Sequence, residues 1–141
     1  MVKMNNCAYC MEGKLLEPFG IKICELDNAK VYLFKEQSHL GRVIVAPKKH
    51  VSEMTELTSE ERAAFFDDMA KVASAIHKLF KPDKINYGAY GDTAGHMHFH
   101  LVPKYKDGFE WGGIFLMNPD KKYLSEAEYA DIIAKIKNEL Q

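Results

Sequence analysis

Three histidines alternate with apolar residues in the run Gly95-His96-Met97-His98-Phe99-His100-Leu101-Val102-Pro103. Successive side chains of a β-strand point to opposite faces. The run therefore predicts a strand over residues 96–102 with three imidazoles on one face and Met97, Phe99 and Leu101 in the core. At about 3.3 Å per residue, His96 and His100 lie about 13 Å apart on a straight strand, too far to share one metal ion with His98. We interpret the row as a set of histidines that contact successive parts of an extended substrate.

The rest of the chain has the pattern of an α+β fold. Strand-like runs cover residues 21–26, 30–34, 41–47 and 85–90, with Asp27-Asn28 as a hairpin turn after the first. Apolar residues at helical spacing predict helices over 59–80 and 126–140, and a capping box precedes each of them (Thr58 with Glu61, Ser125 with Glu128). A short loop over 91–95 predicts that the last two strands are antiparallel neighbours. With 141 residues and no shift in composition, we expect a single domain over 1–141.

Charge and hydropathy exclude several classes of function. The formal net charge of −1 provides no basic surface of the kind that duplex nucleic acid requires, although a few local donors can bind a mononucleotide or dinucleotide. No run approaches the roughly 18 apolar residues of a membrane span, and the first residues lack the apolar segment of a signal peptide. We therefore expect a cytoplasmic protein that binds neither nucleic acid nor membranes.

Isolated histidines are usually structural, so His77 receives no role. His39 and Arg42, at the entry of the third strand, could face a phosphate, but we expect them at the solvated surface. Three neighbouring histidines are different, because a fold gains nothing from three groups that each ionise near neutral pH. An imidazole nitrogen can attack phosphorus, while its neighbours neutralise oxygens and protonate the leaving group. The central His98 is the predicted nucleophile, and its other ring nitrogen should donate to a carbonyl.

The histidine row, the segment Pro47-Lys48-Lys49-His50 and the pair Cys7-x-x-Cys10 together resemble the histidine triad (HIT) family, from Cys7 to about Gly113. The likeness is to the bacterial branch described as diadenosine polyphosphate hydrolases. It implies a five-stranded antiparallel sheet with a long helix and a C-terminal helix, and a homodimer in which two sheets join. It also implies a nucleotide hydrolase or nucleotidyl transferase for dinucleoside polyphosphates or nucleoside phosphoramidates. Such an enzyme works through a nucleotidyl-histidine intermediate and needs no catalytic cofactor.

The resemblance also assigns residues. His98 matches the family's nucleophile, and His96 and His100 match the residues that contact phosphate and handle protons. We take His98 and His96 as the catalytic pair, and His96, His98, His100, Thr93 and Asn86 as the nucleotide-contacting residues.

The loop Gly91-Asp92-Thr93-Ala94-Gly95 is shorter than in many relatives and lacks their glutamine. Thr93 would supply a hydroxyl there, whereas Asp92 would repel a polyphosphate unless it faces away or contacts a cation.

Cys7 and Cys10 are either two unlinked thiols or part of a metal site. Tetrahedral zinc needs four ligands, and His50 with one histidine of the row would complete the set. Some bacterial relatives resemble such an arrangement, with a closed structural site that ties the N-terminus to the sheet. We predict a structural zinc held by Cys7, Cys10, His50 and His100, which leaves His96 as the partner of His98.

Two other functions are compatible with the same residues. In the first, His96 and His98 are ligands of a catalytic zinc, since a His-x-His pair with a third ligand is a known zinc geometry. In the second, the protein binds nucleotide without reacting, and its dimer surface is its function. Trapping a nucleotidyl-protein adduct would separate the hydrolase from both.

Overall fold

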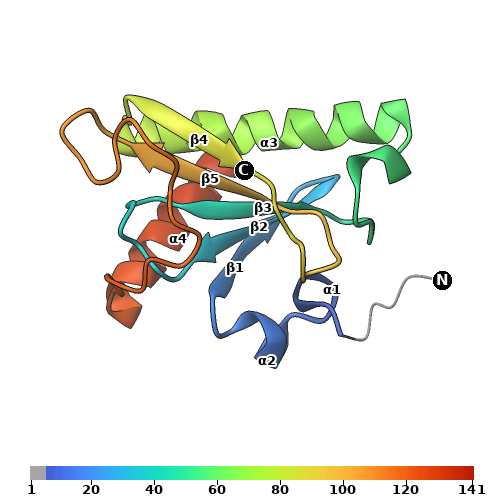
Figure 1. Cartoon of the computed structure of the whole chain (residues 1–141), viewed down its shortest axis with the longest axis horizontal. Helices are drawn as coiled ribbons and strands as arrows, with labels where there is room; N and C mark the ends of the chain where they lie inside the picture. The colour runs from blue at the N-terminus through green and yellow to red at the C-terminus, as the bar shows by residue number, and fades with distance from the viewer. Residues whose placement is uncertain (1–5) are drawn as a thin grey trace.

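A computed structural model describes residues 6–141 of the chain. Its centre is a five-stranded antiparallel sheet in the order β1-β2-β3-β5-β4. The strands are β1 (Gly20–Glu25), β2 (Ala29–Phe34), β3 (Val43–Pro47), β4 (Lys84–Gly88) and β5 (Phe99–Lys104). Figure 1 shows β5 lying between β3 and β4, so the end of the histidine row enters the middle of the sheet.

Alternation along the central strands gives the sheet two different faces. On β2, Leu33 belongs to the large apolar core and its neighbour Phe34 to a separate cluster on the opposite face. On β5, Leu101 lies in the large core, whereas His100 pairs with Ile44 of the opposite cluster. We call these the helix face and the pocket face. The predicted alternation of core and imidazole side chains is confirmed on β5.

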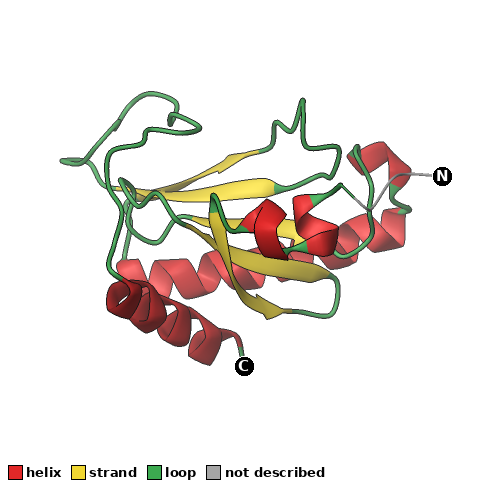
Figure 2. Cartoon of the chain, turned by 90° about the horizontal axis from the view of Figure 1, so that it is seen from below, coloured by secondary structure: helices red, strands yellow, loops and turns green. Residues whose placement is uncertain are grey.

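The helix face is covered by two amphipathic helices, α3 (Ser59–Phe80) and α4 (Glu126–Leu140). Figure 2 shows both on the same side of the sheet. They begin at the predicted capping boxes, where Thr58 accepts the amide of Glu61 and Ser125 accepts the amide of Glu128. The predicted bounds of both helices are confirmed. Within residues 6–141, no helix combines the length and apolar character that crossing a bilayer requires.

The pocket face carries two short helices, α1 (Ala8–Met11) and α2 (Gly13–Leu16). Tyr9 and Leu16 pack there against Tyr32 and Phe34 of β2. A 3-10 helix, η1 (Met54–Glu56), precedes α3 on the chain. The sequence does not predict these elements, because helices of three or four residues are too short to have a recognisable apolar period.

The strand predicted over residues 96–102 is wrong at its start, because β5 begins at Phe99. Pairing between β3 and β5 starts at Val45 and Phe99, and β3 ends at Pro47. The Met97 amide donates instead to the carbonyl of Val51, past the end of β3, at 2.7 Å. The connection from β4 to β5 therefore covers residues 89–98 and not only 91–95. Of the three histidines, only His100 lies on a regular strand.

Candidate functional site

The histidine row divides between two neighbouring sites. His98 and His100 line a pocket on the pocket face, whereas His96 faces the sulfur atoms of Cys7 and Cys10. The division follows from the irregular backbone before β5, which frees residues 96–98 from the alternation of a regular strand.

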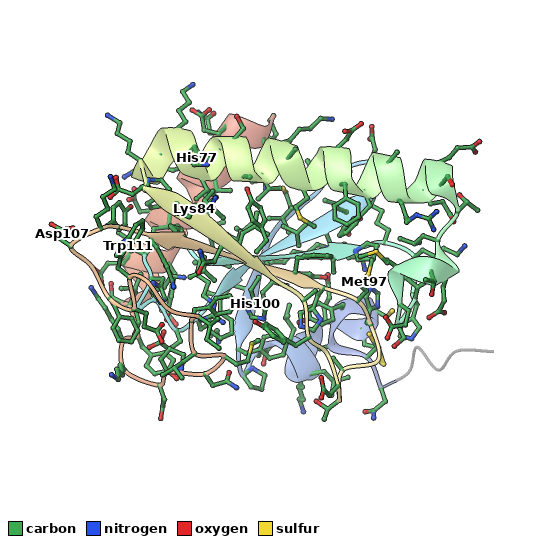
Figure 3. The ribbon with its side chains drawn as sticks, turned by 45° about the horizontal axis from the view of Figure 1, so that its top comes forward. His77, Lys84, Met97, His100, Asp107 and Trp111 are labelled. Atoms are coloured by element: carbon green, nitrogen blue, oxygen red, sulfur yellow. The ribbon has the colours of Figure 1, made fainter. Side chains whose placement is uncertain are left out.

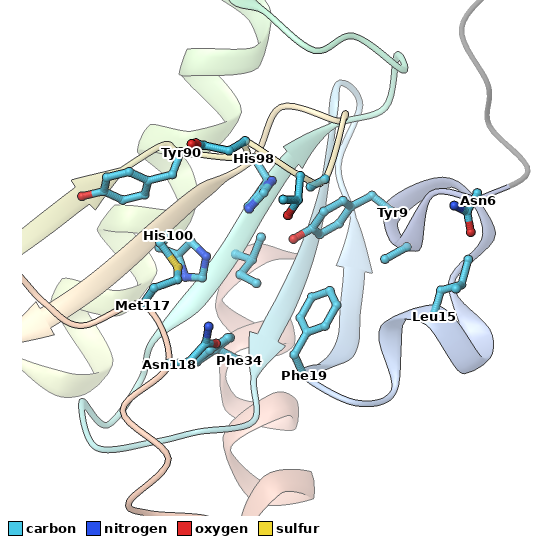
Figure 4. Close-up of a pocket in the computed structure, with 16 residues that line it drawn as sticks. Asn6, Tyr9, Leu15, Phe19, Phe34, Tyr90, His98, His100, Met117 and Asn118 are labelled. Atoms are coloured by element: carbon cyan, nitrogen blue, oxygen red, sulfur yellow. The ribbon is translucent and has the colours of Figure 1, made fainter.

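The pocket has a volume of about 480 Å³, within the range of small-ligand sites. Figure 4 shows Tyr9 and Phe19 on one side and Tyr90, His100 and Met117 on the other. The polar groups that line it besides the histidines and tyrosines include Asp92, Thr93 and Asn118. Aromatic walls with a few converging polar groups are typical of a site for a ligand with a flat apolar part and a polar part.

His98 presents a free lone pair to this pocket. Its Nδ1 lies 2.9 Å from the carbonyl oxygen of His96, and a carbonyl can only accept, so Nδ1 carries the proton. The lone pair is therefore on Nε2, and the predicted bond from the other ring nitrogen to a carbonyl is confirmed. Burial lowers the pKa of His98, which keeps the ring neutral and able to act as a nucleophile.

His100 holds its proton on the opposite nitrogen. Its Nδ1 lies 3.0 Å from Nη2 and 3.2 Å from Nε of Arg42, and arginine can only donate. Nδ1 is therefore the acceptor, and the proton sits on Nε2. Burial, with a further contribution from the Arg42 charge, lowers the pKa of His100 to about 3. The rings of His98 and His100, with centroids 5.6 Å apart, thus offer a lone pair and a proton in one pocket.

A second cluster joins Cys7, Cys10, His50 and His96, whose donor atoms all lie within 4.8 Å of one another. Cys7 Sγ lies 3.3 Å from Nδ1 of His96, and Cys10 Sγ lies 3.1 Å from Nδ1 of His50. Two sulfurs and two imidazole nitrogens are a donor set of tetrahedral metal sites. This cluster could hold a metal ion.

The His96 ring is oriented for this cluster by a backbone bond. Its Nε2 lies 2.9 Å from the carbonyl oxygen of Pro47, so Nε2 carries the proton and the Nδ1 lone pair faces the sulfurs. Nδ1 of His50 lies only 3.0 Å from Nδ1 of His96, and a cation bound to both nitrogens would stabilise this close approach. The prediction of His100 as the fourth ligand is therefore wrong, because Arg42 occupies its Nδ1 and His96 takes the place beside the thiols.

Tyr9 connects the two sites. Its ring stacks on His98, with centroids 4.8 Å apart and planes at 30°. Its carbonyl accepts hydrogen bonds from Lys30 Nζ at 3.0 Å and from the Tyr32 hydroxyl at 3.3 Å. Because Tyr9 lies between the two cysteines of the cluster, the position of its ring depends on the same turn of helix that places both sulfurs.

The other predicted residues have mixed outcomes. Thr93 lines the pocket as expected, and so does Asp92. Asn86 does not line it, because β4 is the edge strand and Asn86 pairs with Val102 on the far side of β5. The surface positions expected for Arg42 and His39 are wrong, because Arg42 is fully buried against His100 and His39 is buried against Glu110.

Several pocket residues lie outside any recognisable sequence motif. Phe34 ends an ordinary apolar strand, and Met117 and Asn118 lie in an irregular segment with no motif. Trp111 does not line this pocket. Figure 3 shows Trp111 and Asp107 near the end of the molecule opposite Met97.

A family model described as the HIT domain matches residues 22–107. The Bacillus subtilis protein named "Protein hit" is 29% identical over 122 residues, which cover 82% of each chain. The asymmetrical bis(5'-nucleosyl)-tetraphosphatase of Schizosaccharomyces pombe is 32% identical over 74 residues, covering 49% of this chain and 41% of that protein.

Solved structures have the same fold. A histidine triad protein from Bradyrhizobium japonicum superposes with a TM-score of 0.82 at 18% identity, over 92% of this chain and 96% of that one. A Zn-bound histidine triad family protein from Mycobacterium smegmatis has a TM-score of 0.67 at 20% identity, over 98% and 95% of the two chains. The predicted five-stranded antiparallel sheet with a long and a C-terminal helix is confirmed. Since the family model spans more than half of the sequence, this chain belongs to the HIT domain family.

Proposed function

We propose that the protein is a nucleotide hydrolase or nucleotidyl transferase that acts on dinucleoside polyphosphates through a covalent intermediate on His98. One observation carries the proposal: in a single pocket His98 has its lone pair on Nε2, whereas His100 has its proton on Nε2. The match to a bis(5'-nucleosyl)-tetraphosphatase, which covers 49% of this chain, supports this substrate class.

In the first step, Nε2 of His98 attacks the α-phosphorus of the bound nucleotide. The N–P bond forms as the P–O bond to the leaving phosphate breaks, and the electron pair departs with the leaving oxygen. The His98 ring becomes cationic, and the carbonyl of His96 stabilises it through the Nδ1 proton. Non-bridging oxygens accept hydrogen bonds from Nε2 of His100 and from the hydroxyl of Thr93.

In the second step, water attacks the phosphorus of the nucleotidyl-histidine. The N–P bond breaks, its electron pair returns to Nε2 of His98, and the proton of the attacking water goes to solvent. A nucleotidyl transfer differs only in the acceptor, which takes the place of water. The atoms of both steps balance without a metal ion.

We infer that Cys7, Cys10, His50 and His96 hold a structural zinc. Four protein ligands fill a tetrahedral shell and leave no position for substrate, which is the pattern of a structural site. When bound, zinc would supply a cross-link between α1, the segment after β3 and the residues before β5. This arrangement argues against the alternative of a catalytic zinc shared by His96 and His98, because the lone pair of His96 faces the two sulfurs whereas that of His98 faces the pocket.

We also propose a homodimer that forms through β4. This strand lies at the edge of the sheet, where its backbone groups can pair with a second strand. Tyr87 on β4 and Tyr90 just beyond it are large, exposed aromatic residues. Light scattering after gel filtration should give about twice the monomer mass of 16.1 kDa, and a monomer at micromolar concentration would contradict the proposal.

The test of the catalytic function is a panel of diadenosine polyphosphates, adenosine phosphoramidate and other nucleotide esters, with products identified by mass spectrometry. We expect AMP as a common product, and binding without turnover for His98→Asn. Nucleotide binding with no turnover by the wild type would favour the non-catalytic scaffold. Loss of turnover on chelation, with the circular dichroism spectrum unchanged, would favour a catalytic metal.

A further inference from the structure

Arg42 is a buried cation that no carboxylate of residues 6–141 contacts. Its side chain is fully enclosed. Glu36 and Glu110 act on this charge only from a distance, since Glu36 accepts the amides of Lys121 and Lys122 and Glu110 pairs with His39. Burying a charge without a counter-ion in contact costs free energy. The groups that this guanidinium does contact must offset that cost.

The guanidinium is held rigidly on every side. Its Nη1 and Nη2 donate to the carbonyls of Leu116 at 3.1 Å and Met117 at 2.9 Å. Its carbon lies 4.1 Å from the centre of the Phe34 ring and 4.9 Å from that of Phe115. Two further N–H groups, one on Nε and one on Nη2, point at Nδ1 of His100.

We propose that Arg42 is a positioning residue that locks His100 in one neutral form with its proton on Nε2. His100 then gives the reacting phosphate a hydrogen bond but no proton, and the site favours leaving groups that depart as anions. Phosphates are such leaving groups and amines are not. This inference rests on the function proposed above and narrows its substrate class to phosphoanhydrides over phosphoramidates.

The chemistry of the pair excludes proton transfer by His100. Loss of the Nε2 proton, while Nδ1 only accepts from Arg42, would leave an imidazolate anion. Gain of a proton on Nδ1 would place two cations in contact. The rings that contact the His100 ring are those of His98, Phe34 and Phe115, none of which is an acid. A departing phosphate takes the electron pair of the broken P–O bond and needs no proton, whereas a departing amine needs one from another source.

The first test reads the His100 ring itself. Nitrogen-15 NMR of labelled histidines should give one Nε2-protonated form of His100 that does not titrate between about pH 5 and pH 8. In Arg42→Met we expect a mixture of tautomers and titration within that range, and in Arg42→Lys a smaller change. Arg62→Met, which removes an arginine of α3 outside the pocket, is the matched control. A proton on Nδ1 in the wild type, or an unchanged His100 in Arg42→Met, would overturn the proposal.

The second test reads the leaving group. Nucleoside 5'-phosphate aryl esters with phenols of graded pKa should react with a steep dependence on that pKa in the wild type and in Arg62→Met. In Arg42→Met a released His100 can become cationic and protonate the leaving oxygen, so the dependence should flatten. An equally steep dependence in Arg42→Met would contradict the restriction on leaving groups. Turnover of the same esters by His98→Ala would refute the proposed nucleophile. It would leave the role of Arg42 intact, because the NMR test of His100 does not depend on which residue attacks phosphorus.

Discussion

His96 and His98 are separated by one residue, yet they belong to different kinds of site. The His96 ring is fixed by the carbonyl of Pro47 and presents Nδ1 to two sulfurs. The His98 ring is fixed by the carbonyl of His96 and presents Nε2 to the pocket. The difference shows that the acceptor bound to one ring nitrogen decides which nitrogen keeps the lone pair and what that lone pair faces. The residue type alone does not decide between ligand and nucleophile.

Exchanging each histidine for alanine should give opposite results. We expect His98→Ala to reduce kcat/KM by at least about 1,000-fold, because among the described residues no other imidazole presents a free lone pair to the pocket, and to keep its metal content. His96→Ala should lose the metal and lower the melting temperature. Turnover is measured with a diadenosine polyphosphate and metal by elemental analysis. Two variants with the same metal content and the same activity loss would mean that the histidines form a single site.

The cysteines allow a matched test of the metal site. Cys10→Ser should abolish stoichiometric metal and lower the free energy of unfolding by roughly 2–4 kcal/mol, because a metal that binds only the folded state stabilises it. Cys24 lies on β1 outside the cluster, so Cys24→Ser should retain the metal. Denaturant unfolding together with elemental analysis checks both. Equal metal content in the two variants would refute the cluster as a metal site.

His100 should make the protein less stable in acid. Its folded pKa of about 3 lies below the unfolded value of about 6.5, so only the unfolded chain gains this proton as the pH falls through 6.5. The free energy of unfolding should therefore fall by about 1–2 kcal/mol more in the wild type than in His100→Gln between pH 7 and about pH 5. The other ionisable groups are present in both proteins, so their contributions to the pH dependence of the free energy of unfolding cancel in this comparison. Parallel pH profiles would show that His100 is not held neutral.

The smallest expected effect on activity concerns Tyr9, whose ring lies between the pocket and the Cys/His cluster. Tyr9→Leu removes the stack on His98 and should lower kcat by about three- to tenfold, as expected for the loss of roughly 1 kcal/mol of ring positioning. Tyr9→Phe keeps the ring and should react at the wild-type rate. Metal content is the control in both variants. A larger loss in Tyr9→Phe than in Tyr9→Leu would mean that the hydroxyl, and not the stack, is what matters.

Regular periodicity made most of the fold predictable. The capping boxes and apolar stripes fixed both long helices, and alternation identified the strands and the two faces of β5. The site was only partly predictable, because residues 96–98 leave the strand and their orientation depends on Pro47 and Val51, which are remote in sequence. The burial of Arg42 depends on packing between segments, which no local pattern encodes.

The proton positions of His98 and His100 predict where a substrate becomes attached. The most direct measurement is to mix the protein with a diadenosine polyphosphate, quench within milliseconds in alkaline denaturant that preserves phosphoramidates, and map the adduct by peptide fragmentation. We predict a nucleotidyl group on His98 alone, absent from His98→Ala and present in His96→Ala wherever that variant folds. A nucleotidyl group on His96 or His100, or turnover at the wild-type rate without any adduct, would contradict the assignment.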